Sequence, residues 1–139
     1  MIKYFFLSII ILTFTGNGFA QSKTSPNSII GIYWSPKKDA KVEIYQKAGR
    51  YFGKTIWVAT PGKDVKNPKP SLRQRELLGL ELFTNFSFDE GEYEDGEIYD
   101  PATGKTYDCK MTYNGDQLKV RGYIGISLFG RTEYFQRIR

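Results

Sequence analysis

The sequence predicts an all-β fold, an antiparallel β-barrel of about eight strands with one short helix. Two tight-turn signals, Asp100-Pro101-Ala102-Thr103-Gly104 and Asn114-Gly115-Asp116, divide the stretch 96–131 into three strand-like runs, a β-meander. The middle run alternates in polarity and places four side chains on one apolar face: Tyr107, Cys109, Met111 and Tyr113. Hairpin-linked strands of this kind can close on themselves, which removes exposed sheet edges and encloses packed side chains or one small ligand.

The first twenty residues have the features of a signal peptide, so we exclude them from the fold. Lys3 supplies a positive start, residues 4–14 form an uncharged apolar core, and Gly18-Phe19-Ala20 gives a cleavage site before Gln21. An uncleaved membrane anchor is the alternative, but an apolar core of roughly a dozen residues is shorter than the ~20 that span a bilayer. We therefore expect an exported protein, periplasmic or secreted, with no membrane span after cleavage.

A single domain is expected after the signal peptide. Residues 21–28 are polar and predict a flexible lead-in, and residues 29–139 form one barrel domain without an internal repeat. The formal net charge of +5 comes without a lysine-rich tail or an arginine stripe. The charge therefore indicates a solvated surface, and we expect no nucleic-acid partner.

The first three expected strands are short and are separated by turn residues. Residues 29–34 end at Ser35-Pro36, and residues 41–47 alternate well between polar and apolar side chains. The third strand, 51–60, carries apolar side chains on both faces, so neither face is expected to be fully solvated. Its two faces hold Phe52, Ile56 and Val58 on one side, and Tyr51 and Trp57 on the other.

Residues 61–70 form the one long irregular connection, rich in Gly, Pro, Lys and Asn. The S-x-x-Q pattern that follows is typical of a helix capping box, and it predicts a short helix over 71–78 that stops at Gly79. Strand character then returns, with an apolar face made of Leu80, Leu82, Phe86 and Phe88. The acidic segment 89–97 predicts a hairpin tip, and residues 132–138 predict a last strand after the meander.

Five pieces of sequence stand in order between Gly31 and Arg137. They are Gly31-x-x-Trp34, Gly53-x-x-x-Trp57, N-P-x-P-S-L-R-x-R at 67–75, I-Y-D-P-A-T-G-K-T-Y at 98–107, and L-K-V-R-G-Y-I-G at 118–125 with Gly130-Arg131. Together they resemble the DUF2147 family of exported bacterial proteins. The resemblance implies a lipocalin-like β-barrel, and it carries over no catalytic residues because the family is one of unknown function.

The resemblance also implies a contact that closes the barrel. Lipocalins usually pair a G-x-W motif on the first strand with an arginine on the last strand. This chain has Gly31-Ile32-Tyr33-Trp34, one residue longer, and it offers Arg131 or Arg137 as the arginine. A cation–π contact between Trp34 and one of these arginines is the expectation.

The inventory of reactive side chains predicts that the protein is not an enzyme. The chain contains no histidine, no nucleophile elbow and no phosphate-binding glycine loop. The single cysteine, Cys109, is expected to pack as a small hydrophobe. Glu97 and Asp100 offer a pair of carboxylates, but Asp100 precedes proline in a turn, where such a side chain commonly bonds the backbone. We expect no catalytic residues and no cofactor.

The acidic run 89–97 is the candidate for a bound cation, because carboxylate oxygens suit Ca²⁺. Its spacing is not that of an EF-hand loop. A solvated hairpin tip explains the run as well, and we favour that reading, so no metal site is predicted.

Aromatic and polar residues on the predicted inner face give the functional lead. Ligand sites commonly combine an apolar wall with a few convergent polar groups. We expect the walls from Trp57, Phe86, Tyr107, Met111, Tyr113 and Ile124, with Arg121 or Tyr123 as polar handles. In the alternative, Arg121 lies on the outer face and pairs with a carboxylate across strands.

These residues favour an exported, non-enzymatic binding protein that holds a small apolar or amphipathic molecule inside its barrel. The alternative is a protein-interaction module of the cell envelope with a filled barrel. Its contact surface would be the basic loop 61–70, extended by Arg73 and Arg75, and its partner an envelope protein. A cavity in the barrel favours the first hypothesis, and a solidly packed interior favours the second.

Overall fold

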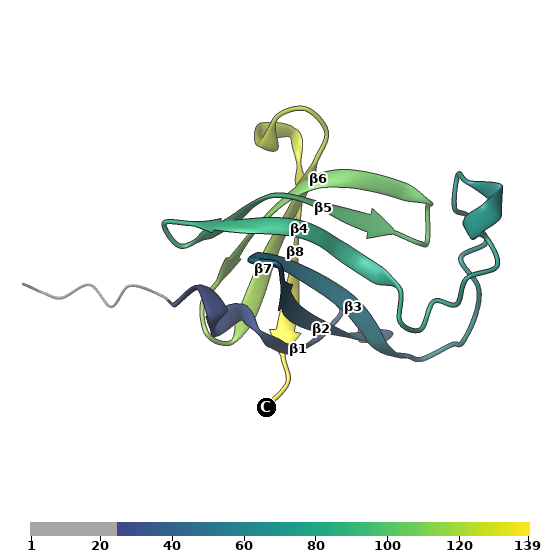
Figure 1. Cartoon of the computed structure of the whole chain (residues 1–139), viewed down its shortest axis with the longest axis horizontal. Coiled ribbons are helices and arrows are strands. Elements are labelled where there is room, and N and C mark those ends of the chain that lie inside the picture. Colours follow the sequence, from purple (N-terminus) through teal and green to yellow (C-terminus); the bar gives the residue numbers. More distant parts are fainter. Residues whose placement is uncertain (1–24) are drawn as a thin grey trace, which may run out of the picture.

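The chain folds into a closed eight-stranded barrel in which every strand is antiparallel to its neighbours (Figure 1). The structure is a computed structural model, and it describes residues 25–139. Each strand pairs with the next in sequence, and β8 pairs with β1 to complete the circle. The strands are β1 (Gly31–Trp34), β2 (Ala40–Lys47), β3 (Arg50–Val58), β4 (Glu81–Asp89), β5 (Glu92–Asp100), β6 (Lys105–Tyr113), β7 (Gln117–Tyr123) and β8 (Arg131–Arg137).

The predicted all-β barrel of eight strands is confirmed, whereas the short helix takes a different form. Where the sequence predicts a helix over 71–78, the structure has a 3-10 helix, η2 (Pro70–Leu72), and no side chain caps its start. Two further 3-10 helices are η1 (Pro26–Ile29) and η3 (Ser127–Phe129). The expected signal peptide, 1–20, and residues 21–24 of the expected lead-in lie outside the described residues.

The side chains of β6 alternate between the two faces as predicted. Those on the inner face help to fill one half of the barrel. Cys109 and Met111 are buried, and they meet a dense aromatic core from the other strands. The large buried side chains of that core are Tyr33, Tyr51, Phe83, Phe86, Tyr93 and Phe135. This packed half of the barrel is solid.

Backbone irregularities change which side chains point inward on β3 and β4. Asn85 has a φ of 64°, so the alternation breaks there and Phe83 joins Phe86 in the core. On β2 and β3 the pairing register shifts between Lys41 and Val42. Trp57 therefore lies on the outer wall, where its ring packs edge-on against Trp34 at 5.8 Å between ring centroids. These shifts are the reason that the predicted faces of both strands differ from the observed ones.

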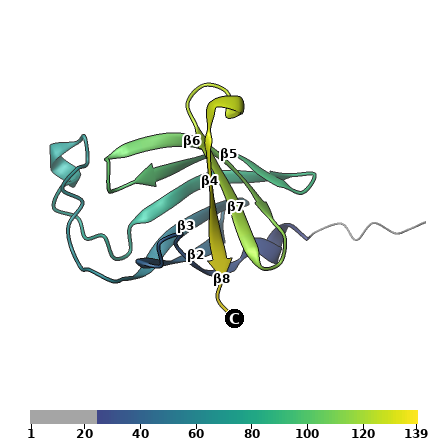
Figure 2. The same ribbon diagram turned by 180° about the vertical axis from the view of Figure 1, so that it is seen from behind.

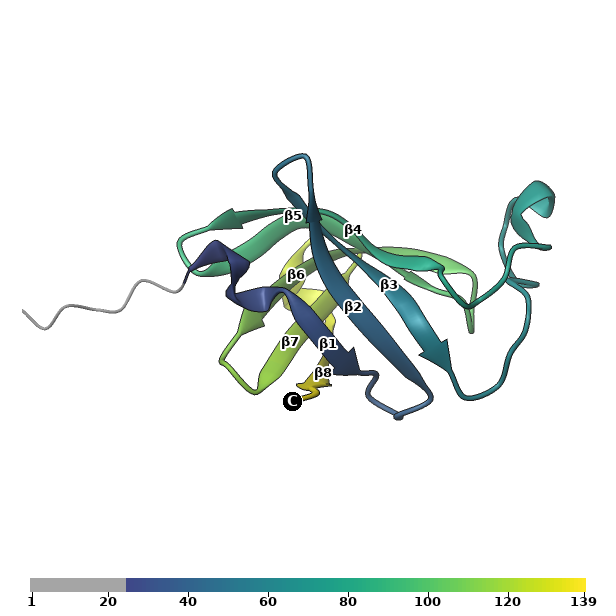
Figure 3. The same ribbon diagram turned by 60° about the horizontal axis from the view of Figure 1, so that its bottom comes forward.

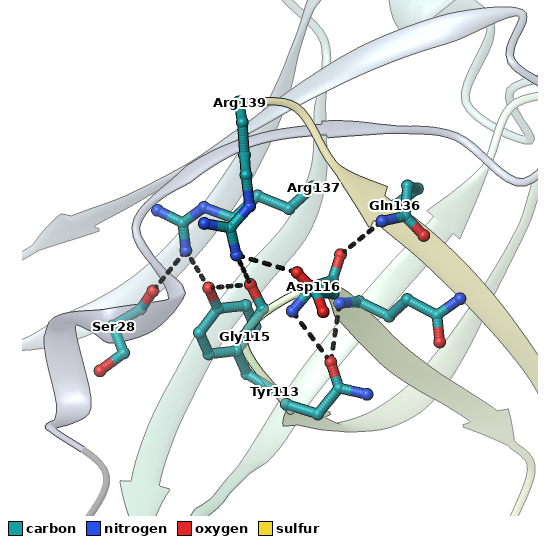
Figure 4. A network of polar contacts seen from close by, with 9 residues as sticks. Ser28, Tyr113, Gly115, Asp116, Gln136, Arg137 and Arg139 are labelled. Atoms are coloured by element: carbon teal, nitrogen blue, oxygen red, sulfur yellow. Dashed lines mark hydrogen bonds and ion pairs between the residues drawn. The ribbon is translucent and has the colours of Figure 1, made fainter.

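The seam between β1 and β8 pairs at only two positions, and Arg137 reinforces it (Figure 4). The Arg137 guanidinium donates hydrogen bonds to the carbonyl oxygens of Ser28 and Ile30, at 2.8 and 2.9 Å, and to the Tyr113 hydroxyl. Its central carbon lies 5.3 Å from the ring centroid of Tyr113 and 5.8 Å from that of Tyr33. One charged side chain thus joins the last strand to β6 and to the chain before β1.

The expected contact between Trp34 and an arginine is wrong: of the two candidate arginines Arg137 makes the closing contact, and it lies over the rings of Tyr33 and Tyr113 instead. Tyr33 follows Gly31 by two residues, so both face inward, whereas Trp34 faces outward. A Cβ at Gly31 would lie 2.8 Å from a guanidinium nitrogen of Arg137, so a larger residue there would push the guanidinium away from this position.

Helix η1 plugs this end of the barrel. Ile29 is fully buried, and the hydroxyls of Tyr33, Tyr51 and Tyr93 donate to atoms of η1 at 2.5–2.7 Å. Figure 3 shows η1 on the same side of the barrel as the β6–β7 turn. Residues 25–28, expected as part of a flexible lead-in, therefore belong to the barrel. We call this end, with η1 and Arg137, the closed end.

Replacing Arg137 by methionine should weaken the barrel seam. Two carbonyl oxygens and the Tyr113 hydroxyl would lose their donor, and we expect the free energy of unfolding to fall by roughly 2–3 kcal/mol. Urea denaturation measures the change. Arg139→Met is the matched control, since Arg139 pairs with Asp116 through an ion pair whose side chains are both exposed. Arg139→Met should change the free energy of unfolding by no more than about 0.5 kcal/mol. Equal losses of stability in both variants would contradict the role of Arg137.

Candidate functional site

The opposite end of the barrel is open, and four connections frame it. They are residues 35–39, the long loop 59–80, the β5–β6 turn 101–104 and the rim loop 124–130. Figure 2 shows the long loop and the rim loop extending away from the ends of the strands. We call this end the mouth.

A cavity of about 530 Å³ opens at the mouth. Its walls are mainly aliphatic: Val58, Leu77, Leu80, Leu82, Ile98 and Val120. Polar side chains stand among the residues that line it: Lys37, Asp39, Tyr99, Asp100, Tyr107, Arg131 and Glu133. The barrel is therefore half filled, with a packed core at the closed end and a cavity above it.

The cavity exists in part because Gly122 contributes no side chain to the inner face of β7. The preceding inward residues, Leu118 and Val120, are buried. A Cβ at Gly122 would lie 3.6 Å from Ile98 and from Tyr107, which is ordinary van der Waals contact. The space beyond that position is open, so a larger side chain there would extend into the cavity.

The long loop is fixed in place by the buried carboxylate of Asp64. Its side chain is fully buried and accepts hydrogen bonds from the Tyr99 hydroxyl at 2.5 Å, from Asn67 Nδ2 at 2.9 Å and from Arg75 Nε at 2.9 Å. Burial by itself raises the pKa of Asp64, but these hydrogen bonds and the charge of Arg75 outweigh burial and lower the pKa below its ordinary value of 3.8. The network ties both arms of the loop to β5.

Two further contacts turn the long loop into a wall of the cavity. Thr55 Oγ1 on β3 donates to the Leu77 carbonyl at 2.5 Å and accepts from the Leu80 amide at 3.2 Å. At the β5–β6 turn, a Cβ on Gly104 would lie 1.9 Å from the Lys66 carbonyl oxygen, so only glycine lets the turn pack against the loop. Leu77 and Leu80 are thereby held along the cavity.

The mouth is suited to binding. Within residues 25–139, no three side chains of the His, Cys, Asp and Glu types come together as metal ligands. Cys109 is fully buried, and burial raises the pKa of its thiol to about 12, so it stays protonated at neutral pH. An aliphatic wall with polar groups around it can hold an apolar molecule that has a polar end.

Comparison with known proteins places the chain in a family. A family model described as an uncharacterized protein conserved in bacteria, DUF2147, matches residues 31–137. The chain belongs to the DUF2147 family. Comparison with curated proteins finds no match.

A solved structure supports the fold of this DUF2147 protein. Protein HP1028 of Helicobacter pylori, described as a member of the lipocalin family, superposes with a TM-score of 0.74 at 24% sequence identity. The match covers 80% of this chain and 83% of that chain. The lipocalin-like barrel implied by the sequence resemblance is therefore confirmed as the fold.

Four of the eight expected ligand-binding residues lie inside the barrel of this DUF2147 protein. Tyr107 lines the cavity. Phe86 and Met111 are buried in the packed half, and Tyr113 bonds Arg137 at the closed end. Ligand contact by these residues stays a prediction, and the geometry favours Tyr107 among them.

The other four lie outside the cavity. Trp57 is on the outer wall, and Ile124 is exposed in the rim loop. Tyr123 pairs across strands with Asp108, and Arg121 pairs with Lys110, on the face of β7 opposite to the buried Val120. Arg121 donates to the carbonyl oxygens of Ser127 and Leu128 and to Thr132 Oγ1, so it supports the rim loop.

Sequence reasoning missed the aliphatic residues of the cavity, although one signal was available. Leu118 and Val120 alternate with Arg121 and Tyr123, so the same alternation puts Gly122 on the inward face of that strand. The long loop gave no comparable signal, because its contribution of Leu77 depends on contacts with distant strands.

Within the described part of the chain, no helix is long and apolar enough to cross a membrane.

Asp64→Asn should loosen the long loop at neutral pH. The variant loses the charge that faces Arg75, and we expect the free energy of unfolding to fall by about 1–3 kcal/mol. The pKa of Asp64 is lower in the folded protein than its ordinary value of 3.8. The charged carboxylate therefore stabilises the fold above pH 3.8, and this stabilisation is lost as the pH falls through the folded-state pKa.

Urea unfolding at a series of pH values checks this expectation. The difference between wild type and Asp64→Asn should narrow as the solution is made more acidic than the ordinary aspartate pKa. Glu76→Gln is the control, because Glu76 forms an exposed ion pair with Lys63. A difference that is the same at every pH would show that the charge of Asp64 does not act as described.

Proposed function

We propose that this DUF2147 protein is a non-enzymatic binding protein for a small, largely apolar molecule, held in the cavity at the barrel mouth. The half-filled barrel supports this proposal, because about 530 Å³ of space lies above a packed core. Small-molecule pockets in proteins commonly enclose roughly 300–1,000 Å³. The cavity is therefore of the size that takes a compact small molecule.

The chemistry of the cavity supports a ligand with an apolar body and one polar end. Aliphatic residues such as Leu82, Ile98 and Val120 would contact the body. Arg131 and Glu133 form an ion pair at 3.0 Å beside the cavity, and the Arg131 side chain is exposed. A polar end placed there keeps contact with water and with charged partners, which avoids the cost of burying it.

We further propose that the protein acts outside the cytoplasm. The positive start, apolar core and small residues around Ala20 support export and cleavage, as set out from the sequence. The interaction-module hypothesis required a filled barrel, and the cavity favours the carrier over it. The likeness to HP1028 concerns the fold.

Filling the cavity from Gly122 tests the carrier directly. Gly122→Phe should place a ring in the cavity, and we expect binding of the apolar fluorophore N-phenylnaphthylamine to weaken at least about tenfold. Fluorescence titration measures the affinity, since the dye brightens when it enters an apolar site.

Gly122→Ala is the matched control for this experiment. A methyl group at this position meets Ile98 and Tyr107 at ordinary contact distance, so the cavity keeps most of its volume. Its affinity for the dye should stay within about twofold of wild type. Unchanged binding in a folded Gly122→Phe protein, checked by circular dichroism, would show that the dye binds elsewhere and would overturn the proposal.

A further inference from the structure

The rim loop, residues 124–130, exposes a run of large apolar side chains that the cavity does not use. The exposed fractions are 75% for Ile124, 57% for Ile126, 74% for Leu128 and 77% for Phe129. None of the four lines the cavity. Figures 1 and 2 show the loop standing clear of the barrel beyond the ends of β7 and β8. Large apolar groups gathered on one surface mark a place where something binds.

The exposure is built into the structure, because the loop is tied down from below. Arg121 donates to the Ser127 carbonyl at 2.6 Å and to the Leu128 carbonyl at 3.2 Å. A Cβ on Gly130 would lie 2.7 Å from the Gly122 carbonyl oxygen, so the end of the loop packs closely on β7. The backbone is anchored while the apolar side chains point outward.

The connections around the mouth and the turns at the closed end differ in their balance of charged residues. Seven basic and three acidic residues lie in the mouth connections 35–39, 59–80, 101–104 and 124–130. By contrast, no basic residue and two acidic residues lie in the closed-end turns 48–49, 90–91 and 114–116. Val65 and Leu78 in the long loop are also exposed. The mouth therefore combines apolar side chains with an excess of positive charge.

We propose that the mouth docks on an anionic lipid surface, with the rim loop inserting its apolar side chains at the boundary between headgroups and acyl chains. Interfacial binding of this kind combines buried apolar area with attraction between basic residues and anionic lipids. Docking goes beyond the binding function proposed above and does not depend on it. Transfer of an apolar molecule from the bilayer into the cavity would follow from both together, because the cavity opens at the same end.

A lipid surface fits the rim loop better than a folded protein partner does. Stable protein interfaces bury about 800 Å² on each partner over a broad, complementary patch. The rim loop instead presents four side chains on a short projection, with charged connections around the mouth. A fluid bilayer accepts a projecting apolar loop without a matching pocket, and its anionic headgroups complement the basic connections.

Vesicle co-sedimentation of the mature chain tests the proposal. Two compositions are compared, pure phosphatidylcholine and phosphatidylcholine with about one third phosphatidylglycerol. We expect binding to the anionic vesicles that weakens as salt is raised, and much weaker binding to the neutral ones. Absence of binding to anionic vesicles would overturn the proposal, and so would equal binding to both compositions.

Leu128→Asp and Ile30→Asp form the matched pair of variants. Both place one negative charge at an exposed apolar position, Leu128 at the mouth and Ile30 at the closed end. Leu128→Asp should weaken binding to anionic vesicles at least about tenfold, and Ile30→Asp should change it less than about threefold. Equal effects of the two variants would overturn the assignment of the rim loop. Gly122→Phe should bind vesicles as wild type does, which separates failure of docking from failure of the cavity.

Discussion

The closed barrel depends on one charged side chain at the seam between its first and last strands. β1 and β8 pair at only two positions, and the Arg137 guanidinium adds hydrogen bonds to the carbonyl oxygens of Ser28 and Ile30 and to Tyr113. A partly buried guanidinium is stable only when its donors are satisfied, so the surrounding chain is constrained to supply acceptors. Gly31 leaves room for the guanidinium, η1 supplies the Ser28 carbonyl group, and Ile30 directly after η1 supplies the other. Because η1 seals this end, the packed core lies here, and the cavity lies at the opposite end of the barrel.

Much of the fold could be predicted because its determinants are local. Alternation on β6 and the two turn signals place the meander correctly, and they are properties of neighbouring residues. The faces of β3 and β4 could not be read in the same way. The left-handed backbone of Asn85 and the register shift beside Val42 reverse the alternation, and neither is visible in the polarity pattern of the strand itself.

The candidate site was predicted less well than the fold, for a related reason. Tyr107 lies on a regular strand, and it does line the cavity. The aliphatic wall from the long loop depends on the buried Asp64 network and on Thr55, which join segments far apart in sequence. Arg121 was predicted as a polar handle of the ligand site, whereas its side chain holds the backbone of the rim loop.

The barrel is hollow at the mouth, and we propose that it binds an apolar molecule there. Amide NMR spectra of the isotope-labelled protein, recorded while N-phenylnaphthylamine is added, test it most directly because they report both binding and position. We expect saturable shifts concentrated at cavity residues such as Leu80, Ile98 and Tyr107, with little change at closed-end residues such as Tyr33. Shifts centred on the closed end, or no shifts at concentrations that saturate the dye fluorescence, would contradict it.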